Sequence, residues 1–91
     1  MNEAMPIVTL YTTRFCPFCV RAKMLLDSKK VEYQEIAVDY DAQQRQTMQR
    51  LSGQRTVPQI WIREQHVGGC DELYQLEREG RLDAMLGENY E

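Results

Sequence analysis

The alternation of short apolar runs with helical patterns is the feature that most constrains the fold of this 91-residue chain. Residues 7–11 and 32–38 have the β-branched and aromatic character of strands. Between them, residues 17–30 show helical spacing, with Val20, Met24 and Leu25 on the expected apolar face. A strand, a crossover helix and a second strand predict two parallel strands in one sheet.

The second half of the chain predicts two more helices, which end at Gly53 and Gly80. It also predicts two antiparallel strands joined by a tight turn at Glu64-Gln65. The resulting order β-α-β-α-β-β-α indicates an α/β fold, and 91 residues suffice for one domain but not for two. These elements are predicted at residues 42–51, 59–63, 65–67 and 70–79, with a short helical segment within 81–91, and the single domain covers residues 1–91.

Composition and charge narrow the function classes. Apolar residues make up 43% of the chain and charged residues 27%, which is typical of a soluble globular protein. No apolar run approaches the roughly 18 residues of a membrane span, and residues 1–4 lack the pattern of a secretory signal, so we expect a cytoplasmic protein. The net charge of −3 gives no support to a nucleic-acid-binding face. Small molecules and protein thiols are the expected partners.

Two of the three cysteines stand three positions apart in Cys16-Pro17-Phe18-Cys19, between a predicted strand and a predicted helix. Free N–H groups and the helix dipole favour negative charge there, so the Cys16 thiolate should be stabilised, and Arg14 could add to this effect. Cys19 lies one helical turn deeper and is expected to be more buried. The pair therefore predicts a redox site with Cys16 as nucleophile and Cys19 as resolving thiol.

Two later segments each allow a functional and a plain interpretation. Thr56-Val57-Pro58 precedes a strand, and a cis Val57–Pro58 bond would expose the Val57 backbone to an extended thiol peptide, whereas the commoner trans bond would mark an ordinary turn. Gly68-Gly69-Cys70-Asp71 marks a strand-to-helix turn. It would either grip the charged end of a small peptide ligand or serve as a helix cap.

Taken together, the three segments resemble those of the dithiol glutaredoxins of the small bacterial type, and the resemblance runs from residue 7 to about residue 86. It implies a thioredoxin-like fold with a four-stranded mixed sheet in the order 2-1-3-4, flanked by helices, and a cis Pro58. It also implies that glutathione is the cosubstrate in the reduction of glutathionylated proteins, low-molecular-weight mixed disulfides and protein disulfides.

The resemblance also assigns glutathione contacts. It pairs the Val57 backbone with the cysteinyl part, places Asp71 and the Cys70 backbone at the γ-glutamyl end, and turns Arg45 toward the glycine carboxylate. Two departures are visible, because Phe18 stands where the family commonly has tyrosine, and Thr13 where it often has lysine, which leaves Arg14 as the candidate replacement. The predicted contact set is Arg14, Phe18, Arg45, Thr56, Val57, Pro58, Gly69, Cys70 and Asp71.

Two metal-binding alternatives remain open from the sequence. The first is a zinc site made by Cys16, Cys19, His66 and Cys70. The second is an iron–sulfur cluster held by Cys16 of two subunits and two glutathiones, which Pro17 disfavours by stiffening the turn. We expect neither metal, and we expect a monomer.

Overall fold

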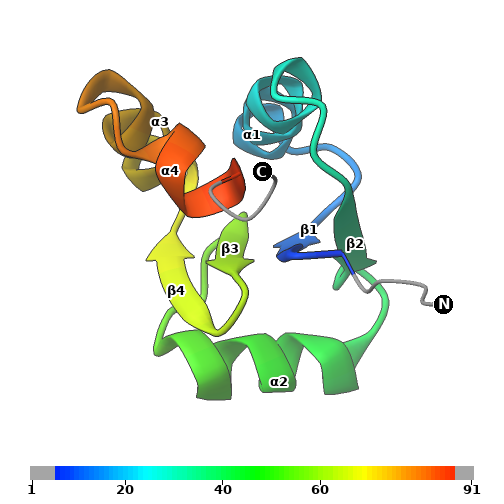
Figure 1. The fold of residues 1–91 in the computed structure, drawn as a ribbon. Helices are drawn as coiled ribbons and strands as arrows, with labels where there is room; N and C mark the ends of the chain where they lie inside the picture. Colours follow the sequence, from blue (N-terminus) through cyan, green and yellow to red (C-terminus); the bar gives the residue numbers. More distant parts are fainter. Residues whose placement is uncertain (1–5, 88–91) are drawn as a thin grey trace, which may run out of the picture.

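The computed structural model describes residues 6–87. Residues 1–4, where the sequence lacks the pattern of a secretory signal, and the end of the predicted 81–91 segment lie outside the described residues. The predicted element order is confirmed, and the short helical segment predicted within residues 81–91 is present as a helix at Leu82–Gly87 (Figure 1). The elements are β1 (Val8–Thr12), α1 (Pro17–Ser28), β2 (Tyr33–Ala37), α2 (Ala42–Ser52), β3 (Gln59–Ile62), β4 (Gln65–Gly68), α3 (Cys70–Arg78) and α4 (Leu82–Gly87).

The four strands form one mixed sheet in the order β2-β1-β3-β4, as the resemblance implied. β1 runs parallel to β2 and antiparallel to β3, with Leu10 opposite Glu35 on one side and Ile60 on the other. One prediction is wrong in detail. The predicted strand 59–63 ends at Ile62, and the turn between β3 and β4 is Arg63-Glu64 instead of Glu64-Gln65, because Arg63 has a φ of 54° and reverses the chain one residue early. Gln65 is the first residue of β4, in agreement with the predicted strand 65–67.

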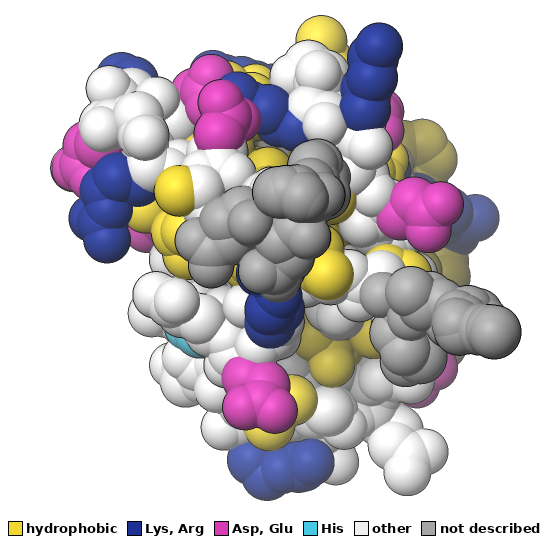
Figure 2. Space-filling model, viewed as in Figure 1, with side chains coloured by type: hydrophobic (Ala, Val, Ile, Leu, Met, Phe, Trp, Pro, Cys, Tyr) yellow, Lys and Arg dark blue, Asp and Glu magenta, His cyan; other side chains and the backbone are white. Residues whose placement is uncertain are grey.

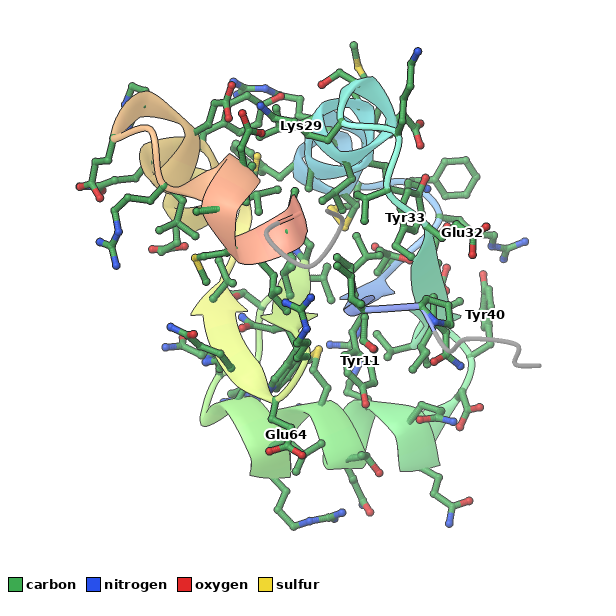
Figure 3. All side chains as sticks on the ribbon, in the orientation of Figure 1. Tyr11, Lys29, Glu32, Tyr33, Tyr40 and Glu64 are labelled. Carbon is green, nitrogen blue, oxygen red and sulfur yellow. A yellow bond between two sulfur atoms is a disulfide. The ribbon has the colours of Figure 1, made fainter. Side chains whose placement is uncertain are left out.

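Helices cover both faces of the sheet, with α1, α3 and α4 on one side and α2 on the other (Figure 1). Successive strand residues point to opposite faces, so Leu10 and Tyr11 belong to different cores. Leu10 packs in the larger core, and Tyr11 lies with Met48 in a smaller one next to α2 (Figure 3). The larger core consists of Val8, Leu10, Ala22, Leu25, Leu26, Val31, Ile60, Ile62, Cys70, Leu73, Leu82 and Leu86.

The predicted apolar face of α1 is partly wrong. Leu25 is buried as expected, but the side chains of Val20 and Met24 are 48% and 62% exposed. The buried residues of this helix are Cys19, Ala22, Leu25 and Leu26. Steps of three and four residues from Cys19 follow the helical period of 3.6, which turns Val20 and Met24 away from the sheet. The face of α1 that packs on the sheet is therefore the one that carries Cys19.

A polar network ties the end of β1 to its neighbours just before the cysteine pair. The Thr12 hydroxyl, which is almost fully buried, donates to Glu35 Oε2 at 2.8 Å, and Lys23 Nζ lies 2.9 Å from the same oxygen. Burial raises the pKa of Glu35, but the hydrogen bonds from Lys23 and Thr12 outweigh it, so the net pKa is below the usual value. The network joins β1, β2 and α1 beside the loop that leads to Cys16.

This network predicts a pH-dependent contribution to stability. A carboxyl whose pKa is lowered by folding stabilises the protein above its unfolded-state pKa, and that contribution is lost as the pH falls through the folded-state value. Glu35→Gln should therefore lower the melting temperature by a few degrees at about pH 7, since the pair is partly exposed. Thermal scans down to about pH 2.5 should show the gap closing. A gap of constant size would mean that packing, and not charge, is responsible.

Charges are mixed over the visible surface. On the face shown in Figure 2, basic and acidic side chains are interspersed among the described residues and do not form a broad field of one sign. Within residues 6–87, no helix is long and apolar enough to cross a membrane.

Candidate active site

Cys16 and Cys19 lie where the loop after β1 leads into α1. Cys16 is the N-cap of α1, with an extended backbone, and Pro17 takes the first helical position, where a missing N–H costs nothing. The Cys19 N–H donates to Cys16 Sγ at 3.1 Å. An N–H group aimed at this sulfur stabilises negative charge on it, which supports the predicted thiolate.

The two cysteines are joined as a disulfide, with their Cα atoms 5.2 Å apart. Cys16 is half-buried, whereas Cys19 is fully buried in the face of α1 that packs on the sheet. The predicted difference in burial is confirmed. A partner molecule can reach Cys16 from solvent, while Cys19 is accessible only to Cys16.

The segment before β3 lies against the nucleophile. The Val57–Pro58 peptide bond is cis, as predicted. Cys16 Sγ lies 3.9 Å from the Val57 carbonyl oxygen, although the two residues are 41 positions apart in the chain. The Val57 backbone is therefore available beside the sulfur that would bind a thiol peptide.

A pocket of about 180 Å³ opens next to this pair. It brings together every predicted glutathione contact except the two arginines, and it adds Glu72, which the sequence analysis did not single out. The pocket lining is Phe18, Thr56, Val57, Pro58, Gly69, Cys70, Asp71 and Glu72. The structure thus assembles three separate sequence segments into one concave surface, and the role of these residues in binding glutathione stays a prediction.

The two glycines of the last segment are required by their surroundings. Gly68 has a φ of 119°, and a Cβ there would lie 3.0 Å from the Glu72 side chain. A Cβ on Gly69 would lie 3.3 Å from the Pro58 carbonyl oxygen. Glycine therefore lets the start of α3 approach the proline segment closely enough to form the pocket.

The start of α3 is capped by Glu72 and not by Asp71. Glu72 Oε1 accepts the Gly69 N–H at 2.8 Å, three residues before it in the chain. Asp71 is exposed at the pocket wall, and its side chain makes no hydrogen bond to another described residue. Glu72 thus serves as the cap that the plain interpretation of this turn required. The Asp71 carboxylate is left free for a ligand.

The third cysteine lines the pocket and packs into the larger core. The Cys70 side chain is 4% exposed and belongs to the larger core. Burial raises the pKa of the Cys70 thiol, so the neutral form is favoured. Cys70 is a packing residue at the base of the pocket and is poorly suited to act as a nucleophile.

Neither predicted arginine lines the pocket. Arg14 Nε lies 3.3 Å from Asp39 Oδ2, and its guanidinium stacks over the Tyr40 ring at 4.7 Å; Tyr40 projects outward beyond β2 (Figure 3). The Arg14 backbone N–H and guanidinium hold the pKa of Asp39 below its usual value. Arg45 lies in α2 and donates to the Arg55 carbonyl at 3.4 Å, next to the pocket residue Thr56. The guanidinium groups of both arginines are therefore bound to residues other than the cysteine pair.

The zinc alternative is not supported by the arrangement of its ligands. Over residues 6–87 the structure contains no group of three or more His, Cys, Asp or Glu residues placed to hold a metal ion. His66 is instead hydrogen-bonded to Gln59 at 2.8 Å. The four residues proposed as zinc ligands therefore do not form one site.

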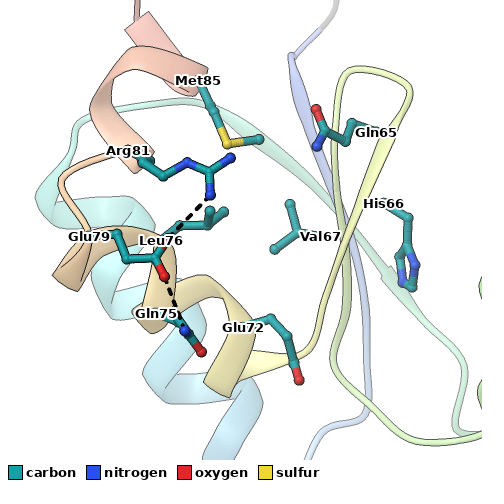
Figure 4. Close-up of a pocket in the computed structure, with 9 residues that line it drawn as sticks. All are labelled: Gln65, His66, Val67, Glu72, Gln75, Leu76, Glu79, Arg81 and Met85. Carbon is teal, nitrogen blue, oxygen red and sulfur yellow. Dashed lines mark hydrogen bonds and ion pairs between the residues drawn. The ribbon is translucent and has the colours of Figure 1, made fainter.

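A second hollow lies between β4 and α3 (Figure 4). Its volume is about 270 Å³, and its wall includes Val67, Leu76 and the Glu79–Arg81 ion pair. No cysteine lines it. This hollow is therefore separate from the cysteine pair.

A half-buried cysteine at a helix start, a buried cysteine one turn later and a cis-proline segment against the first sulfur define a class of protein. The fold and site are those of a thiol–disulfide oxidoreductase with the thioredoxin-like fold.

Comparison with known proteins narrows this class. The glutaredoxin family model matches residues 8–67. The chain is 57% identical over 82 residues to a glutaredoxin of Pseudomonas aeruginosa, covering 90% of this chain and 98% of the relative. It is 52% identical over 79 residues to glutaredoxin 3 of Escherichia coli, covering 87% of this chain and 95% of the relative. The chain belongs to the glutaredoxin family.

Solved structures agree with this assignment. A buckwheat glutaredoxin–glutathione complex superposes with a TM-score of 0.83 at 32% identity, covering 91% of this chain and 78% of the other. The solution structure of a glutaredoxin from Brucella melitensis gives a TM-score of 0.78 at 48% identity, with 94% of each chain covered.

Proposed function

We propose that the protein reduces glutathionylated proteins, low-molecular-weight mixed disulfides and protein disulfides at the expense of glutathione. The observation that carries this proposal is the pocket beside Cys16, whose wall joins Phe18, Val57 and the Gly69–Asp71 turn. A relative of similar fold is a glutaredoxin in complex with glutathione, which supports the choice of ligand.

The first reaction begins with the Cys16 thiolate. It attacks the glutathione sulfur of a glutathionylated thiol, so a Cys16–glutathione disulfide forms and the sulfur–sulfur bond of the substrate breaks. The electron pair leaves with the substrate sulfur, which takes up a proton and departs as a thiol. A second glutathione thiolate then attacks the glutathione on Cys16, which yields glutathione disulfide and restores the Cys16 thiolate.

Cys19 enters when the substrate is a protein disulfide. Attack by Cys16 gives a mixed disulfide with one substrate sulfur, and the other substrate sulfur leaves as a thiol. Cys19 then attacks Cys16 Sγ, which releases the second substrate thiol and closes the Cys16–Cys19 disulfide seen in this structure. Two molecules of glutathione return the pair to dithiol and become glutathione disulfide.

The residues around the pocket would supply partners for the cysteinyl and γ-glutamyl parts of glutathione. The Val57 backbone would pair with the cysteinyl unit, because it lies beside Cys16 Sγ. The first N–H groups of α3 would bind the γ-glutamyl carboxylate, and Asp71 would accept its ammonium. Thr56, Pro58, Gly69 and the ring of Phe18 would enclose the peptide. The glycine carboxylate would be bound by Arg45 or Arg14. Each of these arginines would have to leave its present partner to reach it.

We further propose that the enzyme works as a single-domain monomer in the cytoplasm without a bound metal. A dithiol that must be kept reduced by glutathione suits a reducing compartment.

The test is a coupled assay with a mixed disulfide of glutathione and a small thiol, with reduced glutathione, glutathione reductase and NADPH supplied. We expect steady NADPH oxidation that requires both the protein and glutathione. Replacement of glutathione and its reductase by thioredoxin reductase should give little turnover. Equal turnover with thioredoxin reductase alone would contradict the proposed glutathione dependence.

A further inference from the structure

The first residue of β3 carries a buried amide. Gln59 stands opposite Tyr11 of β1, and its side chain is 2% exposed. A buried amide is costly unless its donors and acceptor are paired, and this one is paired at both ends. Its partners lead in two directions, toward the proline segment and toward β4.

Toward the proline segment, the amide holds Thr56 twice. Gln59 Nε2 donates to the Thr56 carbonyl oxygen at 3.0 Å and to its hydroxyl at 3.2 Å. A carbonyl oxygen can only accept, which fixes the amide with its nitrogen facing Thr56 and its oxygen facing the other way.

Toward β4, the amide oxygen meets His66. Gln59 Oε1 lies 2.8 Å from His66 Nε2, and since Oε1 can only accept, Nε2 must carry a hydrogen. The imidazole packs on the ring of Trp61, its neighbour across the strands, with centroids 4.6 Å apart. His66 projects from β4 on the side opposite Val67 (Figure 4). The ring is therefore held by its contact with Trp61 and by its hydrogen bond to the Gln59 amide.

The bond to Thr56 sets the direction of the next N–H. The Thr56 carbonyl and the Val57 N–H belong to one planar peptide unit and point in opposite directions when that unit is trans. With the carbonyl drawn inward onto Gln59, the Val57 N–H faces away from the protein interior. It makes no hydrogen bond to another residue within 6–87, and Val57 lines the pocket beside Cys16.

We propose that Gln59 and His66 are positioning residues that aim the Val57 N–H at the substrate peptide. This inference rests on the proposed function, because it concerns how the same pocket receives a glutathionyl group. Trp61 packs against His66, and His66 donates a hydrogen bond to the Gln59 amide. Gln59 in turn holds the Thr56 carbonyl, which sets the direction of the Val57 N–H. Neither residue lines the pocket beside Cys16. Both lie at an adjoining hollow of about 280 Å³ that shares Thr56 with that pocket, and the two bonds from Gln59 to Thr56 are the link that we assign to them.

Four variants test the pair. Gln59→Leu removes both bonds to Thr56, and His66→Phe keeps an aromatic ring on Trp61 but removes the donor to Gln59. His66→Gln restores an N–H donor of about the same reach. Gln65→Leu is the matched control, because it makes the same change of side chain at an exposed position of the adjacent strand.

The readouts are KM and kcat for a glutathionylated peptide, together with the ionisation of Cys16 followed by thiolate absorbance. Gln59→Leu should raise KM about tenfold with kcat changed less than about twofold, since the two neutral hydrogen bonds that hold Thr56 are lost together with the bond to His66. His66→Phe should raise KM by a smaller factor of about three to five, and His66→Gln should return it to near the wild-type value. Cys16 ionisation should not change in any of them.

An unchanged KM in Gln59→Leu and His66→Phe, with only a lower melting temperature, would overturn the proposal and leave the pair as packing residues. If Gln59→Leu does not fold, the comparison of His66→Phe with His66→Gln decides. A wild-type protein that does not use glutathione would instead refute the proposed function. In that case the Val57 amide signal in ¹H–¹⁵N NMR spectra still tests the positioning role, because both disruptive variants should shift it while Gln65→Leu should not.

Discussion

Replacing Cys16 by serine is expected to lower turnover of glutathionylated substrates by at least about a thousandfold. A serine hydroxyl is not ionised at neutral pH and cannot form the disulfide intermediate, so both half-reactions lose their nucleophile. The N-cap position and the Cys19 N–H that stabilise a thiolate give no comparable help to an alcohol. The coupled assay with the glutathione mixed disulfide measures this effect.

Cys19→Ser is the matched control, because it makes the same atomic change three residues away. It should keep much of the activity on glutathionylated substrates and lose activity on protein disulfides, which need a resolving thiol. The buried position of Cys19 supports this division, since only Cys16 is open to an external disulfide. Similar losses in both variants on the glutathionylated substrate would show that the roles are assigned wrongly.

Asp71→Asn is expected to raise the KM for glutathione about tenfold. The substitution keeps the size of the side chain and removes the charge that we assign to the γ-glutamyl ammonium. Hydrogen bonds to charged groups contribute about 1.5–3 kcal/mol, and we take the lower end because Asp71 is exposed in the free protein. Steady-state kinetics with varied glutathione measures the change.

The stability of the Asp71→Asn variant separates binding from structure. Because Glu72 caps α3, the melting temperature should fall by no more than a few degrees, through the weaker helix-dipole interaction. Glu64→Gln, at the turn between β3 and β4, is the control for loss of one acidic charge (Figure 3). If Asp71→Asn lowers the melting temperature but leaves glutathione kinetics as in Glu64→Gln, Asp71 has a structural role only.

The sequence predicted the element order well because each strand and helix carries a local signal. The apolar run before Cys16, Pro17 at the helix start and Gly53 at a helix end each act on their own segment. The exposed face of α1 was harder to predict. Val20 and Met24 share a helical spacing as good as that of Cys19, Ala22 and Leu26, and only the position of the sheet decides which set is buried.

The site was predicted where residues are neighbours in the chain and missed where they meet only in space. Nothing in the sequence brings Gln59 and His66 together, because their contact depends on the register of β3 against β4. The sequence places Arg14 close to Cys16 in the chain, but its guanidinium binds the Asp39 carboxylate, 25 positions away. Glu72 could have been found, since an acid three residues after a helix N-cap is a known capping pattern.

The most direct test of the central claim is to trap the first intermediate. The Cys19→Ser variant, reduced and freed of reductant, is mixed with a glutathionylated peptide in the absence of reduced glutathione and examined by intact-mass and peptide-mapping mass spectrometry. We predict one glutathione per protein molecule, attached at Cys16, together with release of the free peptide thiol. A disulfide between Cys16 and the peptide, glutathione on Cys70, or an unmodified protein would contradict attack by Cys16 at the glutathione sulfur.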